Sequence, residues 1–126
     1  MTIVLHASAA YDLLTEANCR DKIAGADDLI APDLIVPELL NARWNVARSG
    51  EAAPTLQRAI DFLERMRLLP SLPYAADAAG LAEALDHPMY DCLYVAVAQR
   101  EQGKLLTIDD RLSKKLRASK LTRLLR

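Results

Sequence analysis

The chain has 126 residues, of which 52% are hydrophobic and only six are aromatic, and its formal net charge is −1. A chain of this length is expected to form one domain, over residues 1–126, with a core built mainly from aliphatic side chains. No cationic leader precedes the first apolar run, and no apolar run is long enough to cross a bilayer. These observations exclude a secretory signal and a membrane span and predict a cytoplasmic protein.

The charge is unevenly distributed along the chain. Residues 1–110 carry a formal charge of −8, and residues 111–126 carry +7 with no acidic side chain. Such asymmetry is typical of proteins that bind a polyanion, although a solvated amphipathic tail would give the same pattern. Cys19 and Cys92 lack the spacing of a metal site and are expected to be reduced, buried thiols.

Short apolar runs alternate with helical periods, which predicts an α/β fold with a mostly parallel sheet of four to five strands between helices. The first strand is expected at residues 2–6. Ser8 is positioned to cap a helix over 9–16, and a second short helix follows over 17–25. The second strand is expected at 29–31.

The middle of the chain continues the alternation. A helix is expected over residues 32–50, with Gly50 as its C′ residue. A second helix follows over 53–66, then a Pro-bounded strand at 68–72 and an Ala-rich helix over 75–85.

The last third of the chain contains the most apolar helix, expected over residues 89–102 and closed by Gly103. A strand at 104–108 and a basic helix beginning at Asp109–Asp110 come next. A short edge strand is expected within 121–125.

A narrow stripe of polar residues lies on the predicted helix 32–50. Glu38, Asn41 and Asn45 fall at positions i, i+3 and i+7, on one side of the helix. A solvent-facing stripe would explain this pattern, but Glu38 lies in a densely apolar stretch where an ordinary surface would carry more charge.

Two aspartates are unusual for their surroundings. Asp91 is the only charged residue between Met89 and Ala98, in a helix whose apolar residues predict burial on all sides. A buried carboxylate needs a partner, so Asp91 is expected either to cap the helix or to belong to a site. Asp109 follows a strand, as His6 does, and ligand sites of parallel sheets lie beyond the carboxyl ends of strands.

These acids can meet in one pocket above the sheet. Carboxylates held close together repel one another unless a cation is present. Hard oxygen ligands suit Mg²⁺ or Mn²⁺. Such a cation can activate water and stabilise charge on a phosphoryl group.

The stretches IVLHAS, APDLIVPELLNARW and HPMYDCLYVAVAQREQGKLLTIDDRL, with the helices between them, resemble the PIN-domain family, specifically the VapC-like ribonuclease toxins of toxin–antitoxin pairs. The most specific part is YDCLYVAVA followed by LLTIDDRL. The resemblance covers nearly the whole chain. It implies a single PIN-like domain, an RNA substrate, bound Mg²⁺ or Mn²⁺, a small antitoxin partner and a homodimer.

By matching position, the resemblance implies that Glu38, Asp91 and Asp109 are catalytic, metal-binding carboxylates. The neighbours that it implies as supports of this pocket are Ser8, Asn41 and Thr107. The basic stretch begins beside the expected pocket, so its first cations are expected to bind the RNA backbone. These cations are Arg111, Lys114 and Lys115.

His6 departs from the family, which has Asp at this position. The change reduces the expected site from four anionic groups to three. Imidazole is a softer, neutral donor that suits Zn²⁺, Ni²⁺ or Mn²⁺ better than Mg²⁺. We therefore expect weakened Mg²⁺ affinity if His6 serves as a ligand in place of Asp.

Other interpretations stay open. A PIN domain with impaired catalysis would act as an antitoxin-binding or RNA-binding module, and His6 could be a substitution introduced to reduce toxicity. A response-regulator receiver domain also has an acidic pocket at strand ends, but it needs adjacent acids after the first strand, which this chain lacks.

Four further side chains are expected to have packing roles. His87 would pack at the start of the helix 89–102, and Tyr90 and Tyr94 would lie in the core. Trp44 would fill the core or a subunit interface.

Overall fold

A computed structural model describes all 126 residues, and four parallel strands form its central sheet in the order β3-β2-β1-β4. The strands are β1 (Thr2–Leu5), β2 (Asp28–Pro32), β3 (Arg67–Leu69) and β4 (Lys104–Leu106). Because all the strands run in the same direction, their carboxyl ends meet at one edge of the sheet. The predicted α/β class and parallel sheet are confirmed.

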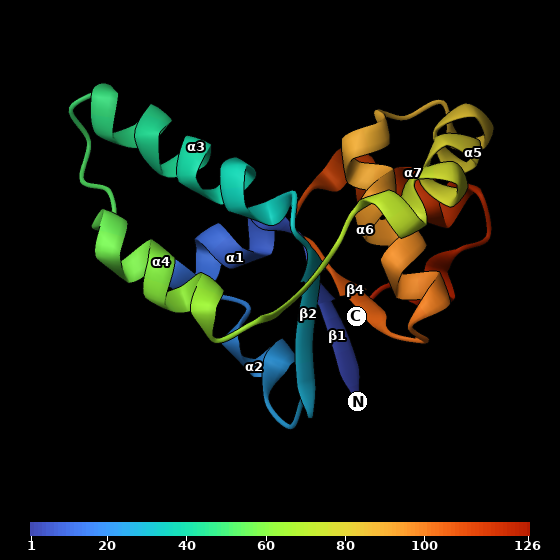
Figure 1. Ribbon diagram of the computed structural model, residues 1–126, viewed down its shortest axis with the longest axis horizontal. Helices are drawn as coiled ribbons and strands as arrows, with labels where there is room; N and C mark the ends of the chain where they lie inside the picture. Colours follow the sequence, from blue (N-terminus) through green and yellow to red (C-terminus); the bar gives the residue numbers. More distant parts are fainter.

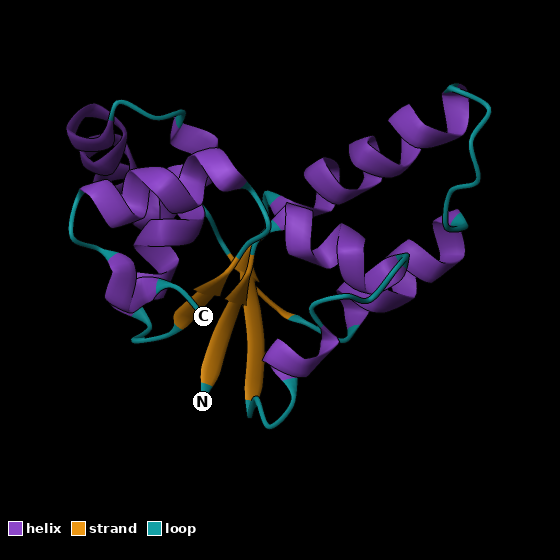
Figure 2. Ribbon diagram, turned by 180° about the vertical axis from the view of Figure 1, so that it is seen from behind, coloured by secondary structure: helices purple, strands orange, loops and turns teal.

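Seven α-helices accompany this sheet; α2 lies beside the amino-terminal half of β2, and most of the others form two groups that diverge above the carboxyl edge (Figures 1 and 2). On one side α1, α3 and α4 pack against one another, and on the other side α5 packs against α6. The helices are α1 (Ala7–Leu14), α2 (Arg20–Ile23), α3 (Ile35–Arg48), α4 (Leu56–Glu64), α5 (Ala75–Leu85), α6 (Met89–Arg100) and α7 (Asp110–Ala118). Two 3₁₀ turns, η1 (Leu72–Tyr74) and η2 (Thr122–Leu124), complete the chain.

The core lies between the central strands and α6. Ile3, Val4 and Leu5 of β1 are fully buried, as expected for a central parallel strand covered on both faces. From Cys92 to Ala98 every residue of α6 is buried, and this helix contacts β1, β2 and β4. The all-round apolar pattern of α6 therefore reflects burial on all sides, as predicted.

Two helix boundaries differ from the prediction, the start of α1 and the end of α6, because Ser8 and Gly103 do not have the capping roles expected of them. α1 begins at Ala7, so His6 is its N-cap residue and Ser8 lies inside the first turn, where it does not cap the helix.

Gly50 has a positive φ of 87° after α3, as predicted for a C′ residue. After α6 it is Gln102, with a φ of 54°, that takes the left-handed conformation. Gly103 instead lies against β1, where an added Cβ would come within 3.1 Å of the Thr2 carbonyl oxygen.

The predicted edge strand within residues 121–125 is wrong. This segment forms η2, and only one parallel bridge, between Leu105 and Leu125, joins the chain end to β4. Cys19 and Cys92 are free and buried, as predicted. None of the helices has both the length and the apolar character that a membrane crossing requires.

Candidate functional site

Residues from four elements gather at the carboxyl edge of the sheet. His6 directly follows β1, and Thr107 directly follows β4. Glu38 lies in the first turn of α3, which comes after β2, and Asp91 lies in the first turn of α6. The parallel topology therefore brings together side chains that are up to 101 residues apart in the chain.

Asp91 is held between two imidazoles. His6 Nε2 lies 2.8 Å from Asp91 Oδ1, and His87 Nε2 lies 2.7 Å from Asp91 Oδ2. Both histidines are buried, with relative exposures of 5% for His6 and 6% for His87. Each oxygen of this carboxylate thus has its own nitrogen partner from a different part of the fold.

The protonation of this group follows from its contacts. Burial raises the pKa of Asp91, but the hydrogen bonds and charges of His6 and His87 outweigh it and leave the pKa lowered. An ionised carboxylate only accepts hydrogen bonds, so both Nε2 atoms donate. His87 Nδ1 is buried without a partner, and a hydrogen on it would cost about 1–3 kcal/mol as an unsatisfied donor.

The other nitrogen of His6 is held by two hydroxyl groups. His6 Nδ1 lies 2.8 Å from Ser8 Oγ and 3.0 Å from Thr107 Oγ1. The same hydroxyl oxygens accept backbone N–H groups, of Ile108 on Ser8 and of Asp109 on Thr107. Ser8 and Thr107, predicted as supports, therefore fix the His6 ring and the turn after β4.

Tyr94 connects Glu38 to this cluster. Its hydroxyl donates a hydrogen bond of 2.6 Å to Glu38 Oε1, and its ring meets the His6 ring edge-on, with the centroids 4.8 Å apart. Burial, followed by the carboxylate of Glu38, raises the pKa of Tyr94 far above its ordinary value, so the phenol stays protonated. Glu38 and Asp91 are thus the two ends of one chain of contacts.

Asp109 is joined to this cluster only through its backbone. Its side chain caps α7, since Asp109 Oδ1 accepts the Leu112 N–H at 3.1 Å. Its own N–H binds Thr107 Oγ1. Asn41 is exposed and makes no hydrogen bond to the cluster, and Asn45 instead binds Arg48.

The packing roles expected for four side chains are only partly correct. Tyr94 is fully buried, as expected, but it also binds Glu38, and His87 binds Asp91. The spacing contained the signal, because His87 and Tyr94 lie four residues before and three residues after Asp91. Tyr90 is 66% exposed and Trp44 is 54% exposed, so neither lies in the core of this chain.

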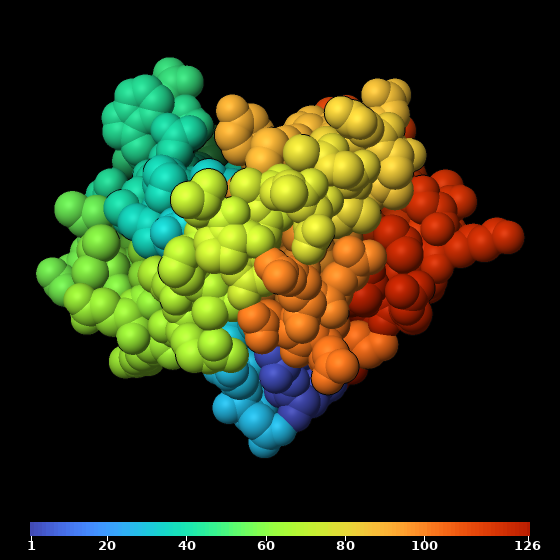
Figure 3. All heavy atoms as spheres, turned by 45° about the vertical axis from the view of Figure 1, so that its right-hand side comes forward, coloured from blue at the N-terminus to red at the C-terminus, as the bar shows by residue number.

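The surface beside the cluster is hollowed. A recess of about 440 Å³ lies between α3 and the start of α6, visible in Figure 3 as a notch between the two helix groups. Its lining residues are Leu34, Pro37, Glu38, Asn41 and Tyr90. Glu38 therefore connects the buried cluster to a surface that a ligand can reach.

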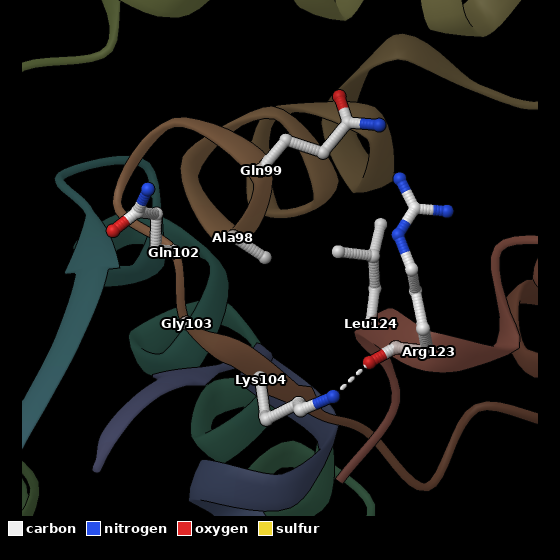
Figure 4. Close-up of a pocket in the computed structure, with 7 residues that line it drawn as sticks. All are labelled: Ala98, Gln99, Gln102, Gly103, Lys104, Arg123 and Leu124. Atoms are coloured by element: carbon white, nitrogen blue, oxygen red, sulfur yellow. Dashed lines mark hydrogen bonds between the residues drawn. The ribbon is translucent and has the colours of Figure 1, made fainter.

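Three other hollows lie away from this notch, one of them between α1 and α4 beside Leu14 and Arg58. Arg111, Lys114 and Lys115 surround one on α7. The third lies at the opposite end of β4, beside the end of α6, where the Lys104 ammonium donates to the Arg123 carbonyl oxygen (Figure 4). Only the basic face of α7 follows directly from the turn that carries Thr107 and Asp109.

The side chains as they lie do not form a cation site. No group of three or more His, Cys, Asp or Glu side chains is arranged to hold a metal ion. Both oxygens of Asp91 are already bonded, Glu38 Oε1 accepts from Tyr94, and Asp109 Oδ1 caps α7.

Comparisons with known proteins agree over nearly the whole chain. The family model described as PIN domain matches residues 3–117. Ribonuclease VapC3 of Pyrobaculum aerophilum is 31% identical over 127 aligned positions, covering 94% of this chain and 97% of that protein. The crystal structure of PAE2754 from Pyrobaculum aerophilum superposes with a TM-score of 0.76 at 25% identity, covering 98% of this chain and 89% of that one.

Proposed function

This chain belongs to the PIN domain family, in its VapC-like branch, and from that premise we propose that it is an endoribonuclease that hydrolyses phosphodiester bonds of RNA. The observation that carries the proposal is the contact chain Glu38–Tyr94–His6–Asp91 at the carboxyl edge of a parallel sheet. It brings two acids from positions that match the family motif to one end of the fold, where α/β proteins bind their ligands. The relative named Ribonuclease VapC3 supports the same reaction class.

Hydrolysis joins a water oxygen to phosphorus, breaks one P–O ester bond and delivers a proton to the leaving oxygen. Glu38 and Asp109 each keep one carboxylate oxygen free of protein hydrogen bonds, so either can accept the proton of the attacking water. Asp91, with both oxygens bonded, orients His6 and His87. Because its carboxylate already accepts two strong hydrogen bonds, it is the poorest base of the three.

The basic face of α7 is proposed to hold the RNA backbone. Arg111 and Lys114 are exposed, Lys115 is partly exposed, and α7 starts immediately after the turn at the site. Phosphate contacts of this kind make binding strongly dependent on salt. Replacing Lys114 and Lys115 by Gln is expected to weaken RNA binding several-fold at low salt and to reduce the salt dependence.

A requirement for Mg²⁺ or Mn²⁺ is a proposal that rests on the family resemblance. The side chains do not form such a site as they lie, and the proton transfer described above needs only Glu38 or Asp109. His6 in place of the family Asp weakens cation affinity, because a carboxylate ligand is lost.

The partners of a VapC-like toxin are proposed for this chain too. They are an RNA substrate, a small antitoxin protein and a second copy of the chain, all in the cytoplasm. Exposed apolar side chains on the helices, including Trp44 and Leu56, offer surface for a homodimer or antitoxin contact.

A second candidate function is a binding module without catalysis. The two hydrogen bonds on Asp91 favour it, because each takes one of the two lone pairs of a carboxylate oxygen and leaves fewer directions for a cation or a substrate. Such a protein would still bind antitoxin or RNA.

The test is cleavage of a labelled RNA with Mg²⁺, with Mn²⁺ and with chelator. The chain, His6→Asp, and His6→Asp combined with Asp91→Asn would be compared. We expect slow cleavage by the chain, at least about tenfold faster cleavage by His6→Asp, and loss of cleavage in the double variant. Absence of cleavage by the chain under every condition, with RNA or antitoxin binding retained, would establish the binding module instead.

A further inference from the structure

We infer that His6 and His87 together occupy the places on Asp91 that a divalent cation would take, so that the site is blocked by its own imidazoles. The inference concerns the site of the proposed function and rests on that proposal for its meaning. It assigns to His87, a residue outside the matched acids, a role as a positioning residue that keeps Asp91 away from cations.

The first step is the occupancy of the carboxylate. Asp91 Oδ1 and Oδ2 accept hydrogen bonds of 2.8 and 2.7 Å from two different rings. Each oxygen keeps one further lone pair, but a cation that took the place of a ring on either oxygen would displace a buried N–H. The buried N–H that loses its acceptor would then cost about 1–3 kcal/mol.

The second step is that neither ring is free to turn away. Ser8 and Thr107 hold His6 through Nδ1, and the ring is packed edge-on against Tyr94. The His87 side chain is 2% exposed and has no second partner, so Asp91 is its only polar contact through the ring. Both imidazoles therefore compete with a cation from fixed positions.

The third step is the state of the other acids. Tyr94 holds Glu38 Oε1, and Asp109 Oδ1 is directed to the N-terminus of α7. No third acid is arranged with Asp91 to make cation binding strong enough to displace the rings. Cation binding to Asp91 is thus opposed by both histidines and by the positions of the other acids, and not by His6 alone.

The experiment measures Mn²⁺ binding in the absence of RNA. Free Mn²⁺ would be titrated by electron paramagnetic resonance and by calorimetry at one constant pH, with the full chain and five variants. The single variants are His6→Asp, His87→Leu, His87→Gln and Asp91→Asn. The double variant combines His6→Asp with Asp91→Asn, and urea unfolding shows that each protein is folded.

His87→Leu and His87→Gln are a matched pair. Leu fills much of the imidazole volume without an N–H, which frees Asp91 Oδ2, whereas Gln keeps a donor for it. We expect His87→Leu to raise Mn²⁺ affinity about three- to tenfold and His87→Gln to leave it near that of the parent chain. If both variants lowered the affinity, His87 would be a cation ligand and the inference would be overturned.

The remaining variants test whether the His6 ring competes with Mn²⁺ for Asp91. His6→Asp removes one competing ring and adds a carboxylate, so about a 10- to 100-fold gain in affinity is expected, and Asp91→Asn should cancel it. Tight, saturable Mn²⁺ binding by the parent chain that Asp91→Asn abolishes would contradict the inference.

Failure of this inference and failure of the proposed function give different results. The binding titrations contain no RNA, so they report on Asp91 whether or not the chain is a nuclease. Cleavage assays on the same proteins report on the function alone.

Discussion

Asp109 and Asp91 lie at the N-terminal ends of α7 and α6, and the two carboxylates have different roles. Asp109 stands before α7 and binds a backbone N–H of the first turn, and its side chain is only partly buried. Asp91 lies inside the first turn of α6, makes no capping bond and binds two buried histidines. A helix cap was one of the two alternatives expected for Asp91, but the structure shows the cap at Asp109.

The difference between the two starts comes from their surroundings. α7 lies at the surface, where the nearest unsatisfied groups are its own N–H groups, which a side-chain oxygen satisfies. α6 is covered by β1, β2, β4 and α5, so polar groups from other elements reach Asp91 first. A carboxylate at a helix start therefore joins a site only when the tertiary fold delivers partners to it.

The largest effect on stability is expected when the carboxylate of Asp91 is removed. Asp91→Leu leaves the N–H groups of His6 and His87 buried without an acceptor, and at about 1–3 kcal/mol for each donor the loss of stability is roughly 2–6 kcal/mol. Urea unfolding measures this change. Asp91→Asn keeps one acceptor oxygen and should give an intermediate loss. A cost no greater than that of an ordinary surface substitution would contradict the buried contacts.

A smaller effect is expected at the exposed helix start. Asp109→Ala removes the cap of α7 and should lower the free energy of unfolding by about 1 kcal/mol. Asp109→Ser restores a capping oxygen and should recover most of this loss in the same urea measurement. Equal destabilisation by Ala and Ser would show that the carboxylate contributes through something other than the cap.

The smallest effect on stability is expected for a third acid, Asp12, which like Asp109 accepts a hydrogen bond from a backbone N–H. Asp12 in α1 is buried, whereas Asp91 in α6 is only partly buried, and Asp12 binds a backbone N–H, that of Cys19, at 2.9 Å. The thiol and backbone N–H of Cys19 lower the pKa of Asp12 below its ordinary value of 3.8. The stabilisation is therefore fully present above pH 3.8 and is lost as the pH falls through the lower, folded-state pKa.

Unfolding free energies measured from about pH 6 down to about pH 2 test this sign. The parent chain should lose stability in the acid part of this range, and Asp12→Asn should show a smaller loss there. If the variant lost as much stability as the parent between these pH values, Asp12 would not be the group responsible.

Much of the fold was predictable because it depends on local patterns. The apolar run of β1 and the all-round apolar character of α6 predict burial, and Gly50 marks the end of α3. The boundary missed at the end of α6 has a tertiary cause: Gln102 takes the left-handed turn, and Gly103 lies where an added Cβ would meet Thr2 of β1.

The candidate site was predictable only in part, since the roles of His87 and Tyr94 in the cluster were not predicted. Residue type and position identified Glu38, Asp91, Asp109 and His6 as unusual. The partner of each, whether Tyr94, His87 or the Leu112 N–H, depended on which side chains the fold places within hydrogen-bonding distance.

The amino-acid sequence by itself determined the order of strands and helices, the buried helix and the presence of a histidine among acids, because hydrophobic periodicity and residue chemistry are properties of neighbouring positions. Only the tertiary structure decided that His6 and His87 share one carboxylate. Residues 6, 87 and 91 meet because parallel strands end at one edge of the sheet and α6 starts beside it. Hydrogen bonds act over about 3 Å, a distance that spacing along the chain does not report.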